Sequence, residues 1–389
     1  MKIDKRSPTA YDKSLSFLNF KSTQSQEGKS LVLNKIKKVL FNKKEVNKLN
    51  KKQKEIIKYL KSDLYLNTKS DRARFKLTPN ISKEISFLEE KDILRYLIHR
   101  YRYDIYPVMN IMDDYPPYLQ IEPTSFCNYR CVFCFQSNKS FSKKSSGYMG
   151  HMELDTFKRT VDQAEGNIEF ISLASRGEPM VARKIEKMLE YANGKFLNLK
   201  INTNASVLDE KKCHSILSNN VKTLVFSADA ASESLYSKLR VNGELNKVLS
   251  NIKLFKKIKE LHYPKSKIIT RVSGVKVSKM QNFKSMEKFW GTLVDQVAFV
   301  DYCPWENVYV TKKNDIAKPC SELWRRMYVW WDGKTNPCEV DYKSKLSAGN
   351  IFNSNISKIW KSKNYNFLRK KHLLGNRSEI DPCNKCFSV

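Results

Sequence analysis

Three cysteines within a short segment constrain this chain more than any other feature. Cys127, Cys131 and Cys134 are separated by three and then two residues, so one loop can bring their thiolates to a single centre. Iron–sulfur clusters take thiolate ligands, usually four. A [4Fe–4S] cluster with three local cysteines leaves one iron open to another ligand. The alternative is a structural zinc site, which needs a fourth Cys or His nearby, and the next histidine is His151.

A second set of cysteines lies near the C-terminus. Cys320 and Cys338 flank a predicted hairpin, and Cys383 and Cys386 form a CxxC pair. The chain has 9 cysteines, an odd number, which argues against a disulfide framework. Four thiolates in this pattern indicate a metal centre, either structural zinc or a second iron–sulfur cluster. Spacing alone does not choose between them.

The two remaining cysteines carry weaker signals. Cys213 shares helical spacing with Ile216 and Leu217, which predicts a core position. Cys303 follows the last predicted strand, where it would either face substrate or be a buried structural thiol.

Short β-branched segments alternate with helical patterns through the middle of the chain. The predicted strands are 119–122, 169–174, 199–202, 223–227, 268–275 and 296–300. The predicted helices between them are 154–164, 184–192, 210–217, 232–239 with 245–261, and 283–293. This alternation predicts a parallel sheet with right-handed connections, either an open barrel or a doubly wound sheet. Ligands would then bind at the C-terminal ends of the strands.

The segments on either side of this alternating region have different sequence patterns. Residues 1–114 read as a basic, mainly helical extension, with helices expected at 31–49, 51–60 and 92–105. After the barrel-like segment 115–310, residues 327–331 and 334–338 flank Asp332-Gly333, which predicts a hairpin. A helix at 355–374 and a cysteine-bearing loop complete a small domain over 311–389.

The first cysteine set and the strand order together resemble the radical SAM superfamily. Its signature, CxxxCxφC, follows the first strand of a partial (β/α)6 barrel, and Phe133 fills the aromatic φ position. Further matches follow the later strands: Arg176-Gly177-Glu178-Pro179 at the GEP motif, Asn202-Thr203-Asn204 at the TNG region with Ala205 in place of Gly, Ser227 with Asp229, and Arg271 with Ser273. The resemblance covers residues 115–303. It implies an α/β protein with a partial (β/α)6 TIM-like barrel.

The resemblance also implies how S-adenosylmethionine (SAM) would bind. SAM would ligate the open iron of a [4Fe–4S] cluster through its amino and carboxylate groups. The backbone of Gly177, Glu178 and Pro179 would receive the amino group, and Phe133 would flank the adenine. The candidates for ribose and carboxylate contacts are Thr203, Asn204, Ser227 and Arg271, since arginine suits a carboxylate.

The C-terminal cysteines resemble the short form of the SPASM domain, called twitch, which has one hairpin, one helix and one auxiliary [4Fe–4S] cluster. Their arrangement resembles that of the butirosin-pathway amino-cyclitol dehydrogenase. This resemblance implies that Cys320, Cys338, Cys383 and Cys386 hold a second [4Fe–4S] cluster. Full ligation leaves no open iron for substrate, so the expected role is to accept an electron.

These features predict a radical SAM oxidoreductase that abstracts hydrogen from a sugar- or cyclitol-like substrate. The alternative is a maturase that modifies a ribosomally synthesised peptide. A flavodoxin or ferredoxin would supply electrons. A non-enzymatic iron–sulfur relay is disfavoured by the GEP segment. Candidate catalytic residues at strand ends are Arg176, Asp229, Asp301 and Glu306.

Composition adds a few exclusions. The net charge is +31, but the excess is spread along a chain rich in Lys, Asn and Ile, so nucleic-acid binding is not the favoured explanation. No apolar stretch reaches the length of a membrane span, and the N-terminus lacks a signal-peptide core. A cytoplasmic location is expected.

Overall fold

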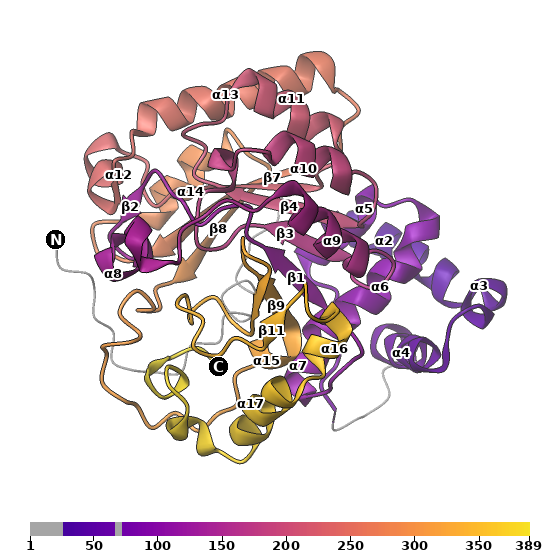
Figure 1. Cartoon of the computed structure of the whole chain (residues 1–389). Helices are drawn as coiled ribbons and strands as arrows, with labels where there is room; N and C mark the ends of the chain where they lie inside the picture. Colours follow the sequence, from indigo (N-terminus) through magenta and orange to yellow (C-terminus); the bar gives the residue numbers. More distant parts are fainter. Residues whose placement is uncertain (1–25, 67–71) are drawn as a thin grey trace. The chain divides into compact units, whose positions relative to one another are not determined.

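The computed structural model describes residues 26–66 and 72–389 (Figure 1). The chain divides into two compact units. One comprises Leu18–Asp113, and the other contains Asp114–Val389. The boundary near residue 310 between the barrel-like segment and the C-terminal segment stays a prediction.

The first unit is helical. Its elements are α2 (Gln26–Leu40), α3 (Lys43–Asn47), α4 (Lys51–Lys61), η1 (Ser62–Leu66), α5 (Pro79–Phe87), α6 (Glu90–Asp104) and α7 (Tyr106–Met109). The stretch 31–49 is helical as expected, but it is divided into α2 and α3. Asn42 interrupts it, because its side chain accepts hydrogen bonds from the amides of Lys44 and Glu45 and so caps a new helix.

The second unit contains the predicted parallel sheet. Six strands run in the order β1 (Tyr118–Ile121), β3 (Phe170–Leu173), β4 (Asn198–Thr203), β5 (Thr223–Ser227), β7 (Ile269–Lys276) and β8 (Gln296–Asp301). All five neighbouring pairs are parallel. The connecting helices are α9 (Leu154–Ala164), α10 (Ile185–Ala192), α11 (Glu210–Ser218), α12 (Glu233–Leu239), α13 (Leu245–His262) and α14 (Phe283–Gly291). The partial (β/α)6 architecture is confirmed.

Alternation along each strand separates two faces of the sheet. Leu119, Ile121 and Leu173 belong to the main core with helix residues such as Phe157 and Leu189. Their neighbours on the opposite face are polar: Gln120, Ser172 and Lys200 are consecutive partners in register. The sheet therefore packs one apolar face on helices and turns a polar face inward, as an active-site barrel requires.

The C-terminal segment joins this sheet. The predicted hairpin is present as β9 (Arg326–Val329) and β10 (Lys334–Asn336), followed by β11 (Gly349–Asn350). Strand β9 pairs in parallel with β1, so the sheet has 9 strands. Sequence reasoning missed this pairing. The predicted helix at 355–374 is also wrong, because Ser362 caps a new helix and divides the segment into α16 (Ile356–Trp360) and α17 (Lys363–Leu373).

Candidate functional site

The first cysteine set lies on the loop that follows β1. Strand β2 (Arg130–Cys131) pairs with β6 (Arg240–Val241), and the Val132 amide donates to the Leu239 carbonyl at 3.0 Å. The Cys134 amide donates to the Cys131 carbonyl at 3.0 Å. These bonds fold the loop around Cys131, which is buried, while Cys127 and Cys134 are partly exposed.

Burial makes these thiols hard to ionise unless a cation is present. It raises the pKa of Cys127 to about 12 and raises the pKa of Cys131 and Cys134 as well, and each is raised further by another thiol or carboxylate nearby. Metal ligation requires thiolates. Three thiols on one loop, all with raised pKa values, fit a cationic iron centre, which would stabilise their thiolate forms.

Arg240 is a neighbour of this set that sequence reasoning missed. Its Nη1 donates to the Sγ of Cys131 at 3.8 Å, and its Nη2 lies 2.7 Å from Oδ2 of Asp229. The other Asp229 oxygen accepts the Val275 amide at 2.6 Å. Asp229 is fully buried, and burial raises its pKa while Arg240 lowers it. The candidate catalytic carboxylate is thus committed to holding Arg240. No spacing in the sequence relates Arg240 to Cys131, because a two-residue ribbon brings them together.

The GEP segment packs directly against the cysteine loop. A Cβ on Gly177 would lie 2.2 Å from the Thr124 carbonyl oxygen and 2.5 Å from that of Phe126. The Glu178 amide donates to the Phe126 carbonyl at 2.9 Å. Gly177 is required because no side chain fits between these two backbones. Pro179 begins the short helix η4 (Pro179–Val181).

Glu178 links the GEP segment to the end of β4. Its carboxylate accepts from Thr203 Oγ1 at 2.6 Å and from the amides of Asn204 and Met180 at 2.7 and 3.1 Å. Burial raises the pKa of Glu178, and these donors oppose that shift. The side chain of Asn204 donates from Nδ2 to Oδ1 of Asn128 in the cysteine loop at 3.0 Å. The structure therefore brings the cysteine loop, the GEP segment and the Thr203–Asn204 turn together, as the resemblance implies.

Ser227 and Arg271 lie at different levels of the sheet. Ser227 ends β5 opposite Ser273, whereas Arg271 pairs with Val225, two residues further from the strand ends. The Arg271 guanidinium donates twice to Gln296 Oε1, at 2.9 and 2.7 Å. The contact of Arg271 with the SAM carboxylate stays a prediction.

Phe133 is buried on the cysteine loop. Its carbonyl accepts from the indole of Trp305 at 2.8 Å, and the Arg240 guanidinium lies 5.9 Å from its ring centre. Its role beside the adenine stays a prediction.

Arg176 is not available to substrate. Its guanidinium, 2% exposed, makes a double contact with Glu122 at 2.7 and 2.6 Å. It also donates to the Tyr342 carbonyl at 2.9 Å and lies over the Trp330 ring at 4.2 Å. This arrangement ties the end of β1 to the C-terminal segment, so Arg176 is a structural residue.

The last two catalytic candidates follow β8. Asp301 is partly exposed, with Oδ1 3.5 Å from Lys276 Nζ. Glu306 is 5% exposed. One of its oxygens accepts from the Tyr302 hydroxyl and from Asn307, and the other has no hydrogen-bond partner within the described part of the chain. Burial raises the pKa of Glu306, against the effect of Tyr302.

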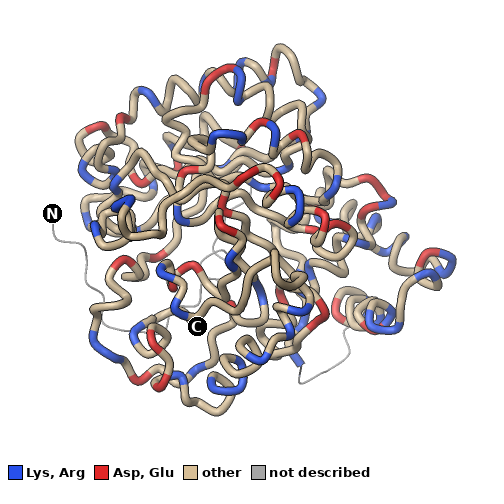
Figure 2. The backbone as a smooth tube through the Cα atoms, viewed as in Figure 1, with Lys and Arg blue, Asp and Glu red and all other residues tan. Residues whose placement is uncertain are grey.

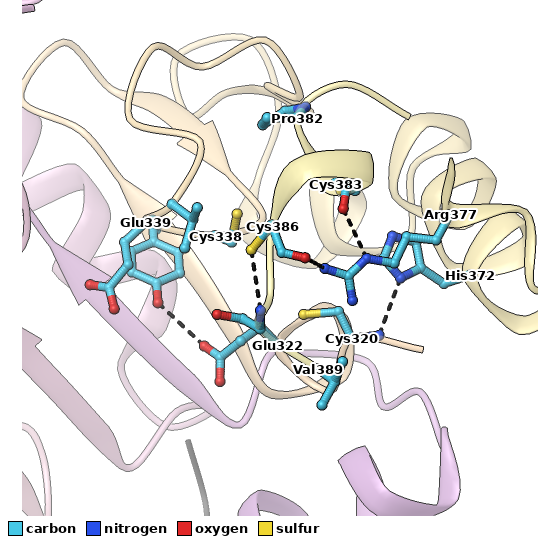
Figure 3. Close-up of a pocket in the computed structure, with 13 residues that line it drawn as sticks. Cys320, Glu322, Cys338, Glu339, His372, Arg377, Pro382, Cys383, Cys386 and Val389 are labelled. Carbon is cyan, nitrogen blue, oxygen red and sulfur yellow. Dashed lines mark hydrogen bonds between the residues drawn. The ribbon is translucent and has the colours of Figure 1, made fainter. Parts of the chain in front are cut away.

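The C-terminal cysteines line one cavity. Figure 3 shows Cys320, Cys338, Cys383 and Cys386 around it, together with Arg377. Burial raises the pKa of Cys320 to about 12 and raises the pKa of Cys338 and Cys383. Four thiols around one space fit a metal centre.

Two buried residues shape the same cavity. Arg377 donates to the carbonyls of Cys383 and Cys386 at 3.0 and 2.5 Å, which fixes the CxxC turn. His372 accepts the Cys320 amide at Nδ1, at 3.1 Å, and burial together with Arg377 lowers its pKa to about 4. The imidazole is therefore neutral at neutral pH.

The remaining cysteines are resolved by their surroundings. Cys213 is fully buried in the main core, as predicted. Cys303 Sγ lies 3.6 Å from the Ser388 hydroxyl, close in sequence to Cys386.

No group of three or more His, Cys, Asp or Glu side chains converges on one metal ion in residues 26–66 and 72–389. A [4Fe–4S] cluster binds each thiolate at a separate iron, so its ligands need not converge on one point. Within the same residues, no helix has the length and apolarity that crossing a membrane requires. Figure 2 shows Lys and Arg distributed along the described chain and interspersed with Asp and Glu.

Comparison with known proteins identifies two domains. Residues 121–269 match the radical SAM superfamily model, and residues 320–387 match the SPASM iron–sulfur cluster-binding domain. The chain is 24% identical over 212 residues to GTP 3′,8-cyclase of Clostridium botulinum (strain Okra / Type B1), covering 52% of this chain. The match spans 63% of that relative's length.

Two solved structures align with much of the chain. SuiB of Streptococcus suis, bound to the precursor peptide SuiA, has a TM-score of 0.55 and 17% identity, covering 87% of this chain and 81% of SuiB. BtrN, the butirosin radical SAM dehydrogenase, in complex with AdoMet and 2-DOIA, has a TM-score of 0.47 and 18% identity, covering 69% of this chain and 92% of BtrN. The SuiB match exceeds the span of residues 114–389, so it extends into the helical unit.

Proposed function

We propose that this chain, a radical SAM enzyme with a C-terminal SPASM domain, oxidises its substrate by two electrons, one of which passes to an auxiliary cluster. The observation that carries this proposal is the cavity lined by Cys320, Cys338, Cys383 and Cys386. All four thiols are available to one centre, which leaves no open position for substrate. Such a centre is suited to electron transfer.

The first site supplies the radical chemistry. When bound, a [4Fe–4S] cluster with SAM would supply reductive cleavage of SAM to a 5′-deoxyadenosyl radical, which would remove a hydrogen atom from substrate. Cys127, Cys131 and Cys134 would hold the cluster, and Arg240 would place a positive charge beside Cys131. The Gly177–Pro179 backbone, with Thr203 and Asn204, would position SAM.

Oxidation also requires removal of a proton. Glu306 fits this role, because one carboxylate oxygen has no hydrogen-bond partner in the described structure and burial raises its pKa. A raised pKa makes a carboxylate a better proton acceptor near neutral pH. We assign the proton-accepting role to Glu306, in preference to Arg176 and Asp229. The side chains of those two residues form ion pairs, with Glu122 and Arg240 respectively.

Two substrate classes remain. The cysteine pattern favours a sugar- or cyclitol-like alcohol that becomes a ketone. The likeness to SuiB, which extends into the helical unit, supports a ribosomally made peptide instead. A peptide requires a larger binding surface than a small alcohol, and residues 18–113 offer a second unit for it. A flavodoxin or ferredoxin is the proposed external electron donor.

A Cys383→Ala/Cys386→Ala variant tests the electron-acceptor role. It should still cleave SAM and transfer deuterium from a labelled substrate into 5′-deoxyadenosine, but it should not release oxidised product. The labelled probes are an amino-cyclitol and any short precursor peptide found encoded beside the gene, assayed separately. Circular dichroism and gel filtration must match the wild type, because metal ligation also contributes folding energy. Full product formation by a well-folded variant would exclude the acceptor role.

A further inference from the structure

A cluster of aromatic side chains lies between the two cysteine sites. Its buried residues are Phe135, Phe141, Val308, Val340 and Tyr342. Cys134 of the first site packs against it, and so do Cys338 and Cys386 of the second. We call this group the aromatic bridge, because one packed cluster touches ligand candidates of both sites.

The bridge forms a continuous series of contacts. Phe135 directly follows Cys134, and its ring stacks on Tyr342 with centres 4.6 Å apart and planes at 17°. Tyr342 meets Tyr309 edge to face, with centres 4.9 Å apart. The Tyr309 hydroxyl donates to Asp341 Oδ1 at 2.5 Å.

The series ends at the second site. Asn336 Nδ2 donates to the carbonyls of both Asp341 and Cys338, at 3.0 and 2.6 Å. Asp341 and Asn336 in this connection are both fully buried. Every step from Cys134 to Cys338 is a covalent link, a ring contact or a hydrogen bond.

Several bonds hold the rings in place. The Trp305 indole donates to the Phe133 carbonyl at 2.8 Å, and its ring lies 5.5 Å from that of Phe135. The Tyr342 hydroxyl donates to the Glu306 carbonyl at 2.9 Å, and the Tyr342 carbonyl accepts from Arg176. Close-packed, fixed rings transmit an electron better than a gap does. The tunnelling rate falls steeply with distance across a gap and less steeply through packed atoms.

We propose that the aromatic bridge carries an electron from the auxiliary cluster to the SAM-site cluster. This inference rests on the proposed function, in which the substrate radical loses a proton and gives one electron to the auxiliary centre. Transfer through the bridge returns that electron to the first centre, which was oxidised when it reduced SAM. The overall balance is substrate plus SAM giving oxidised product, 5′-deoxyadenosine, methionine and one proton. The external donor then only primes the enzyme.

The test follows electron transfer without substrate. Fully loaded protein is reduced by less than one electron equivalent in a light-triggered deazaflavin pulse, and freeze-quench electron paramagnetic resonance follows the two cluster signals. Reference spectra come from the Cys127→Ala/Cys131→Ala/Cys134→Ala and Cys383→Ala/Cys386→Ala variants. Tyr342→Leu and Phe135→Leu should slow equilibration between the clusters at least tenfold. The matched control is Phe255→Leu, which removes another buried ring in edge contact, with Phe226 in the main core.

The outcomes separate the possibilities. Iron content and circular dichroism must equal those of the wild type. If Tyr342→Leu or Phe135→Leu loses iron, that variant is replaced by Tyr309→Leu. Tyr309 is only partly buried, so its substitution disturbs the core less. Wild-type equilibration in every well-folded bridge variant would overturn the proposal. Because no substrate is present, slowed equilibration would stand even if product assays contradicted the acceptor role.

Discussion

The guanidinium of Arg240 joins two groups that lie far apart in the sequence, donating to the Sγ of Cys131 at 3.8 Å while it pairs with Asp229 at 2.7 Å. Arg240 and Asp229 are both buried. Arg240 therefore places a fixed positive charge beside a proposed cluster ligand, and Asp229 keeps it there.

Removing the Arg240 charge should affect stability and cluster potential separately. Arg240→Gln leaves the Asp229 carboxylate buried without its partner, which should cost about 3–5 kcal/mol in urea unfolding. The double variant Asp229→Asn/Arg240→Gln should recover much of that loss. Both variants should have a SAM-site cluster of lower reduction potential, measured by redox titration of its paramagnetic signal. An unchanged potential in the stable double variant would limit Arg240 to a structural role.

Cluster content should follow the two cysteine sets. The wild type, reconstituted without oxygen, should bind about eight iron atoms, four per cluster. Replacing Cys127, Cys131 and Cys134 with Ala should leave about four, and so should replacing the four C-terminal cysteines. Iron and zinc are measured together, since zinc in place of half the iron would show that the second site is a zinc site.

Gly177→Ala should weaken SAM binding at least tenfold. The added Cβ would meet the Thr124 carbonyl oxygen at 2.2 Å, and backbone cannot move aside as a flexible side chain can. The shift should also cost about 1–3 kcal/mol of stability. Gly291→Ala is the matched control, because nothing lies within 4 Å of its added Cβ. Equilibrium dialysis with labelled SAM measures the affinity, and equal affinities for the two variants would contradict the placement of the loop.

Glu306→Gln should change the pH dependence of stability. The pKa of Glu306 is raised in the folded state, so the folded protein binds this proton more tightly than the unfolded chain does. The stability linked to that proton is present below the unfolded pKa and is lost as pH rises through the folded pKa. The variant should therefore gain stability relative to the wild type as pH rises through that window. Urea midpoints measured across pH 4 to pH 8 check this, and parallel curves would refute it.

The same Glu306→Gln variant separates proton removal from hydrogen abstraction. With substrate present, it should still form 5′-deoxyadenosine, because SAM cleavage does not use this carboxylate. Release of oxidised product should fall roughly 100-fold or more, the range expected for loss of a general base. Equal loss of both products would place Glu306 outside the proton-transfer step.

Much of the architecture was predictable because local patterns dictate it. Alternating strand and helix periods located the six strands of the β/α repeat, and cysteine spacing marked both candidate metal sites. Helix breaks at Asn42 and Ser362 were missed, since a single capping side chain overrides a continuous apolar periodicity. Cys213 was correctly placed in the core by its spacing with Ile216 and Leu217.

The sequence by itself determined which residues share a loop or a strand end, because those relationships depend only on spacing along the chain. It could not determine what meets across the fold. Three relationships join distant segments. They are the parallel pairing of β9 with β1, the contact of Arg240 with Cys131 and the buried ion pair of Arg176 with Glu122. Arg271 illustrates the same limit, because only the register of β7 against β5 shows that it lies below the strand ends. Tertiary packing decided these relationships, since the partner of a buried charge is set by where the backbone brings it and by the high cost of leaving it unpaired.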